Sequence, residues 1–196
     1  MEPEKKPSSE LRTEILRHAS RLFAEQGYRA TSVREVAEAC GCTKPALYYH
    51  FANKEALYLE CLDASARRIL ALEAALEPDR PVPERLRCGL TLFFEHVARH
   101  PLGMRLLMRA ELRPEPGQPA YDFEAMRTHH LGRIQELLAE GVARGELRAD
   151  LDLDDAACAL KGMVDQRLQM WLHGTPIPPD AAGRVLSIFL HGVAKR

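Results

Sequence analysis

Apolar residues recur at intervals of three and four along almost the whole chain. No segment alternates apolar and polar residues in the way that is typical of a half-buried strand. This periodicity predicts an all-α protein. Proline interrupts a helix and glycine ends one, so these residues divide the pattern into about nine helices. We expect a helix over residues 9–26, two short helices on either side of Gly41, and further helices over about 54–77, 83–100, 101–113, 121–144, 152–171 and 180–193.

The two short helices around Gly41 follow a longer helix, and this order predicts a helix-turn-helix. Thr43 has the side chain of a helix N-cap, and Pro45 fits a first helical turn, where a missing N–H costs little. Leu47 and Phe51 are four residues apart and are expected to face inward. The second short helix is therefore the one that would lie in a DNA major groove.

Charge and side-chain chemistry around that helix favour DNA as the partner. The chain has a formal net charge of -1, yet residues 39–54 contain no Asp or Glu. Lys44, Tyr48, Tyr49 and His50 remain on the faces that are not buried. Their hydroxyl, imidazole and ammonium groups can contact phosphate oxygens or base edges, whereas a carboxylate there would repel the DNA backbone.

The segment TSVREVAEACGCTKPALYYHFANKEAL, residues 31–57, resembles the tetracycline-repressor (TetR) family of transcriptional regulators. The shared pattern is a Thr/Ser-led helix, an Ala-x-x-x-Gly turn, a Leu-Tyr-x-His-Phe helix and a following Lys-Glu pair. Cys42 departs from it, because a small apolar residue is usual there. The resemblance covers about residues 10–60 and implies DNA contacts from Thr31, Ser32, Arg34, Thr43, Lys44, Pro45, Ala46, Tyr48, Tyr49, His50 and Lys54. Arg34 and Lys44 would contact base edges, and Tyr48, His50 and Lys54 would contact phosphates.

The resemblance also implies the organisation of the whole chain. Residues 1–54 would form a three-helix DNA-binding domain, joined by a long helix to a helical domain over residues 55–196 that binds an effector and dimerises. Polar groups on otherwise apolar helices are the best markers of the effector pocket. The candidates are Phe93, His96, Met104, Arg105, Met108, Arg109, Met126, His130 and Trp171. The arginines would suit a hydrophobic anion such as an acyl-CoA, although each of these polar groups also fits a structural role.

Helix–helix association is indicated near the C-terminus, where the last expected helix is apolar nearly all round. Such a helix cannot face water on any side. We therefore expect a homodimer rather than a monomer with a buried terminal helix. The expected interface consists of Leu160, Val164, Leu168, Val185, Leu186, Phe189 and Val193.

Other classes of function have less support in the sequence. No apolar run is long enough for a membrane helix and no signal peptide is apparent, so we expect a cytoplasmic protein without a membrane partner. No nucleophile–base pair, phosphate loop or metal-ligand spacing is present, so no catalytic residue, cofactor or metal is assigned. A redox-sensing regulator that uses Cys40 or Cys42 is the alternative, and a helical enzyme or lipid-binding module is a third hypothesis.

Overall fold

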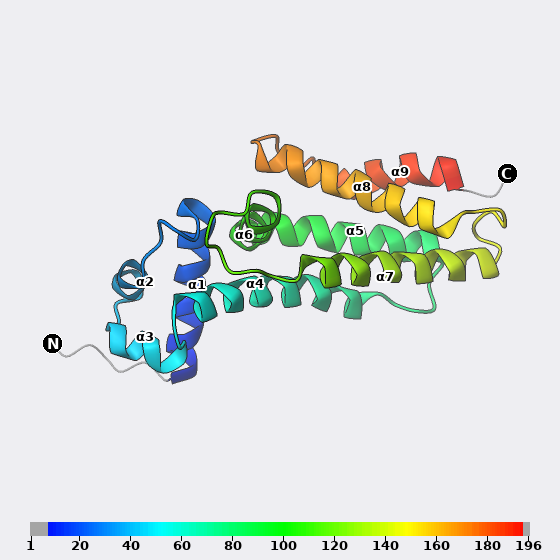
Figure 1. Cartoon of the computed structure of the whole chain (residues 1–196). Coiled ribbons are helices and arrows are strands. Elements are labelled where there is room, and N and C mark those ends of the chain that lie inside the picture. Colours follow the sequence, from blue (N-terminus) through cyan, green and yellow to red (C-terminus); the bar gives the residue numbers. More distant parts are fainter. Residues whose placement is uncertain (1–7, 194–196) are drawn as a thin grey trace. The chain divides into compact units, whose positions relative to one another are not determined.

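The computed structural model describes residues 8–193, and the side chains of residues 9–191. This part of the chain contains nine α-helices, one short 3-10 helix and no strand, which confirms the predicted fold class. The helices are α1 (Ser8–Gln26), α2 (Val33–Cys40), α3 (Lys44–His50), α4 (Lys54–Leu70), η1 (Ala71–Ala75), α5 (Val82–Arg99), α6 (Pro101–Leu112), α7 (Phe123–Ala143), α8 (Leu153–Leu172) and α9 (Ala181–Val193) (Figure 1).

The helices form two compact units, and each is discontinuous in sequence. The first unit contains residues 1–68 and 100–121, and the second contains residues 69–99 and 122–196. The first unit therefore includes α6 and the loop after it, which come from the middle of the chain. The sequence predicts a division by function into residues 1–54 and 55–196, which does not coincide with these packing units. The functional boundary stays a prediction. None of the described helices is long and apolar enough to cross a membrane.

The core of the first unit forms around α1, which packs against α2, α3 and α6. Ile15, Phe23 and Leu47 are fully or almost fully buried, as their helical spacing predicts. The Phe23 ring lies edge-on to Tyr58 of α4, with the ring centroids 5.0 Å apart. Leu106 of α6 is equally buried. The two short helices therefore rest on a well-packed base rather than on each other alone.

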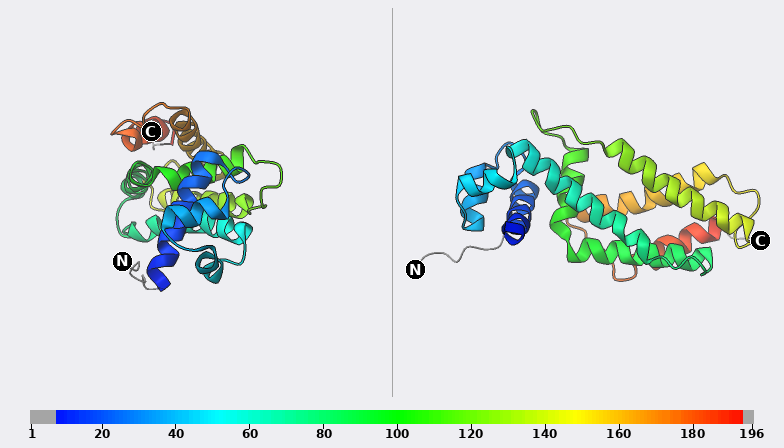
Figure 2. Two further views of the ribbon diagram at one scale, coloured as in Figure 1. Left: turned by 90° about the vertical axis from the view of Figure 1, so that its left-hand side faces the viewer. Right: turned by 90° about the horizontal axis from the view of Figure 1, so that it is seen from below.

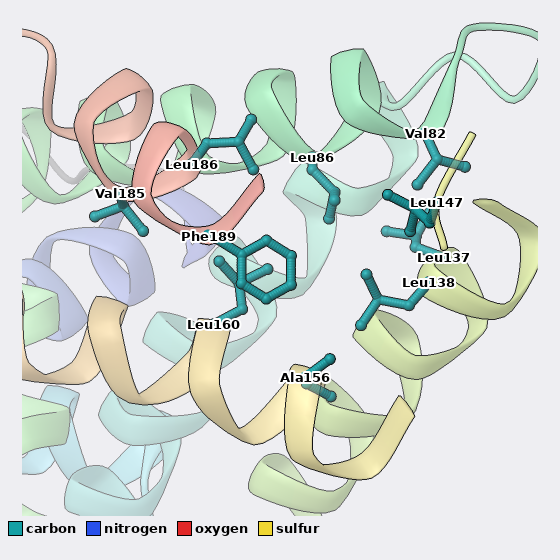
Figure 3. Packing of buried hydrophobic residues seen from close by; sticks show 11 residues of the cluster. Val82, Leu86, Leu137, Leu138, Leu147, Ala156, Leu160, Val185, Leu186 and Phe189 are labelled. Atoms are coloured by element: carbon teal, nitrogen blue, oxygen red, sulfur yellow. The ribbon is translucent and has the colours of Figure 1, made fainter. Parts of the chain in front are cut away.

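The second unit is a helical bundle in which α5 packs against α7 and α9, while α8 packs against α7 and α9 (Figures 1 and 2). Its core joins Leu86 of α5, Leu138 of α7, Leu160 of α8 and Phe189 of α9 (Figure 3). Asp152 begins α8 by accepting a hydrogen bond from the Asp155 N–H at 2.9 Å, as is typical of an Asp N-cap.

The predicted fourth helix is too long, because α4 ends at Leu70 and a 3-10 turn follows over Ala71–Ala75 instead of helix to residue 77. The segment consists of good helix formers, so local propensity does not explain the change. Tertiary contacts supply a reason. The Glu73 carboxylate lies 3.1 Å from His129 Nε2 and 3.2 Å from Arg133 Nε, both on α7. These contacts hold the 3-10 turn against the bundle.

Candidate nucleic-acid interface

The first of the two short helices, α2, begins at a complete capping box. The Ser32 hydroxyl accepts from the Glu35 N–H at 3.1 Å, and the Glu35 carboxylate accepts from the Ser32 N–H at 2.7 Å. Ser32 is thus the N-cap of α2, and the Ser-x-x-Glu spacing in the sequence is typical of this reciprocal pair of bonds. Val36 and Ala37 face the core, which leaves Arg34 exposed on the opposite side.

Gly41 makes the turn between the two helices. Its φ of 66° and ψ of 30° place it in the left-handed region, where a residue with a Cβ atom is disfavoured. Its N–H donates to the carbonyls of Ala37 and Glu38, which closes the end of α2. The turn predicted from the sequence is therefore present, and it fixes the direction in which α3 starts.

The second short helix, α3, is buried against the core on one side and exposed to solvent on the other. Thr43 caps it by accepting from the Ala46 N–H at 3.3 Å. Leu47 is completely buried and Phe51 nearly so, as predicted. Tyr48 and Tyr49 point away from this anchor, with 47% and 81% of their surface exposed. The free face of α3 thus presents aromatic hydroxyls to solvent.

The charges on this surface suit a polyanion. Lys44 and Pro45 are exposed at the start of α3, and Ala46 is half-buried beside them. His50 is half-buried at the other end, with its ring centroid 5.2 Å from that of Tyr49. No acidic residue occurs from Ala39 to Lys54. On α2 the exposed Glu38 carboxylate accepts from Arg34 Nε at 2.7 Å. That pair is exposed and therefore weak enough to rearrange.

Thr31 does not lie on this surface, and its prediction as a DNA contact is corrected. The residue is 1% exposed, and its hydroxyl donates to the Gly27 carbonyl at 2.8 Å. A buried hydroxyl with a satisfied partner cannot reach a phosphate. Ser32 and Thr43 are exposed, and their oxygens accept from backbone N–H groups, so each hydroxyl hydrogen is left to donate to a phosphate.

Lys54 has protein partners that the sequence did not reveal. Its Nζ lies 4.4 Å from the centroid of the Tyr28 ring and donates to the Arg29 carbonyl at 3.4 Å. Burial lowers the pKa of this lysine, and the charges of Glu115 and Glu35 only partly offset the effect. The cation–π contact stabilises a lysine at the start of α4 without a phosphate. Lys54 therefore has a structural role in the protein, and its predicted phosphate contact stays a prediction.

The two cysteines around Gly41 are held as thiols. Burial, followed by the neighbouring Cys42, raises the pKa of Cys40 to about 12, and burial also raises the pKa of Cys42. The Cys40 thiol lies 3.8 Å from the Glu14 carbonyl. Because the thiolate is the reactive species, this environment disfavours oxidation at neutral pH. The structure gives the redox hypothesis no support.

The nine residues predicted to bind an effector divide between the two units. Met104, Arg105, Met108 and Arg109 lie on α6 in the first unit, where both methionines are buried and Arg105 is exposed. The other five, in the second unit, are half-buried: Phe93, His96, Met126, His130 and Trp171. The sharing of one pocket by these residues stays a prediction.

Two of these residues have a clear environment. Burial, with the charge of Lys161 next in size, lowers the pKa of His130, so its imidazole is neutral at pH 7. Arg109 instead directs its guanidinium at the backbone of α1 and at Glu115. Its predicted contact with an anionic effector is therefore corrected, because its Nη groups already have protein partners.

The predicted dimer residues lie mostly inside the second unit's own core. Leu160, Leu168, Val185, Leu186 and Phe189 are each at most 6% exposed within a single chain. The prediction of Leu160, Leu168, Leu186 and Phe189 as interface residues is corrected, because a side chain buried within its own chain offers no surface to a partner. Val185 also lines the groove described next, so its place in an interface stays a prediction. Val164 is half-buried, and the Val193 side chain lies outside the described part.

A different face of α8 and α9 is open. A groove of about 450 Å³ lies between the two helices, with Ile188 67% exposed and Met170 38% exposed beside it. Arg167 and Arg184 add charge at the groove. The complete lining is Gly162, Met163, Gln166, Arg167, Met170, Arg184, Val185 and Ile188.

Comparison with known proteins agrees with this geometry. Residues 15–61 match the family described as bacterial regulatory proteins, tetR family, and residues 79–193 match the tetracyclin repressor-like C-terminal domain. The chain belongs to the TetR family. This confirms the resemblance seen in residues 31–57, and it extends the assignment to residues 79–193, which include α6 of the first unit and most of the second unit. TetR-family proteins are transcriptional regulators and not enzymes.

Individual TetR-family proteins are similar over most of the chain. The HTH-type transcriptional repressor KstR2 of Mycobacterium tuberculosis is 28% identical over 187 residues, which is 94% of this chain and 93% of that protein. The repressor AcnR of Corynebacterium efficiens is 32% identical over 79% of this chain and 78% of its own length. The crystal structure of PfmR from Thermus thermophilus has a TM-score of 0.75 at 27% identity, covering 92% of this chain and 99% of that one.

Proposed function

We propose that this TetR-family regulator is a repressor that binds a near-palindromic operator as a homodimer and is released by a small effector. The free face of α3 is the observation that carries the proposal. Leu47 and Phe51 anchor the helix, while Lys44, Tyr48 and Tyr49 are exposed and no carboxylate lies among them. A helix of this kind enters a major groove, where side chains can contact both base edges and phosphates.

Each exposed side chain suits a particular part of the duplex. Lys44 at the start of α3 and Arg34 on α2 would donate to guanine O6 and N7. Pro45 and Ala46 are apolar and would contact thymine methyl groups or sugars. Tyr49 would contact a base or a phosphate. Phosphate contacts would come from Tyr48 and His50 and from the hydroxyls of Ser32 and Thr43, which position the protein on the backbone without reading sequence.

A near-palindromic operator requires two copies of α3 at a fixed separation, about 34–36 Å or a multiple of one DNA turn. The groove between α8 and α9 is the surface that we assign to the second copy. Ile188 and Met170 leave neighbouring apolar surface exposed to solvent at this groove, which is typical of a protein–protein contact site. The partner would be the same groove of a second chain, because a two-fold interface brings the same patch of both subunits together.

The effector would be small and largely apolar, and it would bind among the helices of the C-terminal domain, which we place in residues 55–196. The relative KstR2 is described as a ketosteroid transcriptional regulator, which supports an apolar effector for this chain as well. An acyl group with an anionic head, such as an acyl-CoA, is the second class. The effector can lower operator affinity only by its differential affinity for the two states, typically about 1–3 kcal/mol. A regulator that reads operator DNA would work in the cytoplasm.

Selection of bound duplexes from a random DNA pool tests the proposal directly. We expect a near-palindromic consensus bound by two copies of the chain. Genes beside matching sites in the source genome would then narrow the effector. Calorimetry of a candidate effector with and without the selected duplex measures the coupling, because linkage requires both affinities to change by the same factor. Recovery of unrelated sequences after selection would refute specific operator binding.

A further inference from the structure

Arg109 of α6 closes the C-terminal end of α1. Its Nη1 donates to the Glu25 carbonyl and its Nη2 to the Gln26 carbonyl, both at 3.2 Å. The last carbonyls of a helix have no partner within the helix, and a cation there also interacts favourably with the helix dipole. α1 has no basic residue in its own last turn. Arg109, 83 positions after Gln26, supplies that charge.

Glu115, in the loop after α6, holds the turn that follows α1. Its Oε2 accepts from the Arg29 N–H at 2.9 Å, and its Oε1 accepts from Arg109 Nη2 at 2.9 Å. The carboxylate lies so close to Gly27 that an added Cβ atom would be 1.8 Å from Oε1. The loop is braced in turn by Gln118, whose amide donates to the Ala110 carbonyl at 3.1 Å. We call the pair of Arg109 and Glu115 the α6 clamp.

Lys54 contacts the same turn from the start of α4. Its bond to the Arg29 carbonyl means that both polar groups of the Arg29 backbone have partners, the N–H on Glu115 and the carbonyl on Lys54. Arg29 lies three residues before Ser32, the N-cap of α2, and Lys54 lies four residues after His50, the end of α3. One turn is thus tied to both flanks of the helix-turn-helix.

The α6 clamp is built differently from the exposed ion pairs of this chain. The Glu115 side chain is 19% exposed, and both of its oxygens accept hydrogen bonds. Arg109 directs two of its three hydrogen bonds at backbone carbonyls. Exposed pairs contribute little, whereas removing one partner from a semi-buried, fully bonded group leaves the other unsatisfied. The clamp therefore fixes backbone position rather than simply neutralising charge.

We infer that Arg109 and Glu115, which lie outside the helix-turn-helix, act in operator binding as positioning residues and not as DNA contacts. The inference rests on the proposed function. The clamp sets where α2 begins, and α2 and the Gly41 turn set the direction of α3. Hydrogen bonds to base edges depend steeply on distance and angle, so a small shift of α3 weakens base contacts more than phosphate contacts.

Binding of two duplexes tests the inference, using the full-length chain and the variants Arg109→Ala, Glu115→Ala, Glu115→Gln and the Arg109→Ala/Glu115→Ala double variant. One duplex carries the sequence that the parent selects from a random pool, and the other has the same composition in scrambled order. Titrations run at several salt concentrations, well below each variant's melting temperature. Circular dichroism confirms folding. If an alanine variant does not fold, Glu115→Gln, which keeps the shape and polarity of the side chain, replaces it in the titrations.

We expect each alanine variant to bind the selected duplex about tenfold more weakly, with unchanged affinity for the scrambled duplex and an unchanged salt slope. The double variant should lose about as much as one single variant, because the two side chains act as one unit. Glu124→Gln is the matched control. It removes a carboxylate from the exposed Arg127–Glu124 pair in the second unit and should bind as the parent does.

Two results would overturn the inference while leaving the proposed function intact. One is a set of folded clamp variants that bind the selected duplex as tightly as the parent. The other is a salt slope that falls by about one in Arg109→Ala, because Arg109 would then be a phosphate contact. A parent that selects no sequence from the pool overturns the proposed function and this inference together.

Discussion

Large non-polar side chains are exposed both on α3 and beside the groove between α8 and α9, and the two faces differ in the chemical groups at the ends of these side chains. On α3 the exposed residues are Tyr48 and Tyr49, whose rings end in hydroxyls beside Lys44. Beside the groove between α8 and α9 the exposed residues are Met170 and Ile188, which have no hydrogen-bonding group of comparable strength. The first face can satisfy a charged, hydrated partner, and the second gains most from another apolar surface.

A hydrophobicity scale alone would treat the two faces alike, but their side chains indicate different kinds of partner. An exposed tyrosine on a short anchored helix points to a polar ligand such as DNA. An exposed isoleucine beside a methionine-lined groove points to a protein. Substitutions on the two faces and at buried or neighbouring positions test this difference.

The largest effect is expected within α9, at the residue adjacent to the exposed Ile188. Phe189→Ala should lower the free energy of unfolding by about 3–5 kcal/mol, because Phe189 is 3% exposed and a cavity would remain among Leu160 and its neighbours. Denaturant titration measures the change. A loss below about 1 kcal/mol would mean that α9 is not packed into the core as described.

Ile188→Glu should act on assembly instead. An unpaired carboxylate in a homodimer interface would weaken the dimer by about 3 kcal/mol, roughly a hundredfold, while the fold of each chain is kept. Sedimentation at several concentrations gives the dissociation constant. Ser187→Glu places the same charge one residue away, outside the groove, and should leave the dimer intact. Equal dimerisation of both variants would contradict the assigned face.

On the α3 face, Lys44→Ala should weaken operator binding by about 1–3 kcal/mol and relax specificity at a few base pairs. Tyr49→Phe removes only a hydroxyl and should cost about 0.5–1.5 kcal/mol of binding. Neither change should lower the melting temperature, since both side chains are exposed. Leu47→Ala, on the buried side of the same helix, is the contrasting control and should reduce stability. Unchanged operator affinity in both exposed variants would remove α3 from the interface.

The smallest effect concerns pH and the turn that supports α3. Burial raises the pKa of Glu115, but hydrogen bonds from the Arg29 N–H and from Arg109, together with their charges, outweigh it and lower the pKa below its usual 4.5. Its contribution is therefore fully present above the unfolded pKa and is lost as pH falls through the lower native pKa. Glu115→Gln should be less stable than the parent at pH 7, and the difference should shrink between about pH 5 and pH 3. A constant difference in denaturant titrations across that range would rule out this linkage.

Local chemistry explains what the sequence could predict. Asn53 caps α4 by accepting from the Ala56 N–H at 2.7 Å, and Gly41 has the left-handed geometry of a helix end. Both signals lie within a few residues of the backbone groups that they satisfy. The anchors Leu47 and Phe51 are predictable for the same reason, because a four-residue spacing fixes one face of a helix.

Long-range contacts explain what it could not. The Arg29–Glu115 bond joins residues 86 positions apart, and no local pattern marks either of them. The apolar character of α9 shows that it avoids water but not which apolar side faces its own chain. Val185 and Phe189 are buried within the unit, whereas Ile188 is not. Direction of packing depends on the neighbouring helices, and the sequence of one helix does not contain it.

The discontinuous first unit has a consequence for synthesis. Residues 1–68 leave the ribosome before α6 exists, and α6 is part of the surface against which α1 packs. At about 5–20 residues per second, the intervening chain takes several seconds to be made. During that interval the emerging N-terminal helices carry an uncovered apolar strip. They would be open to chaperones and to proteases, and they become a finished unit only when the chain has grown past residue 121.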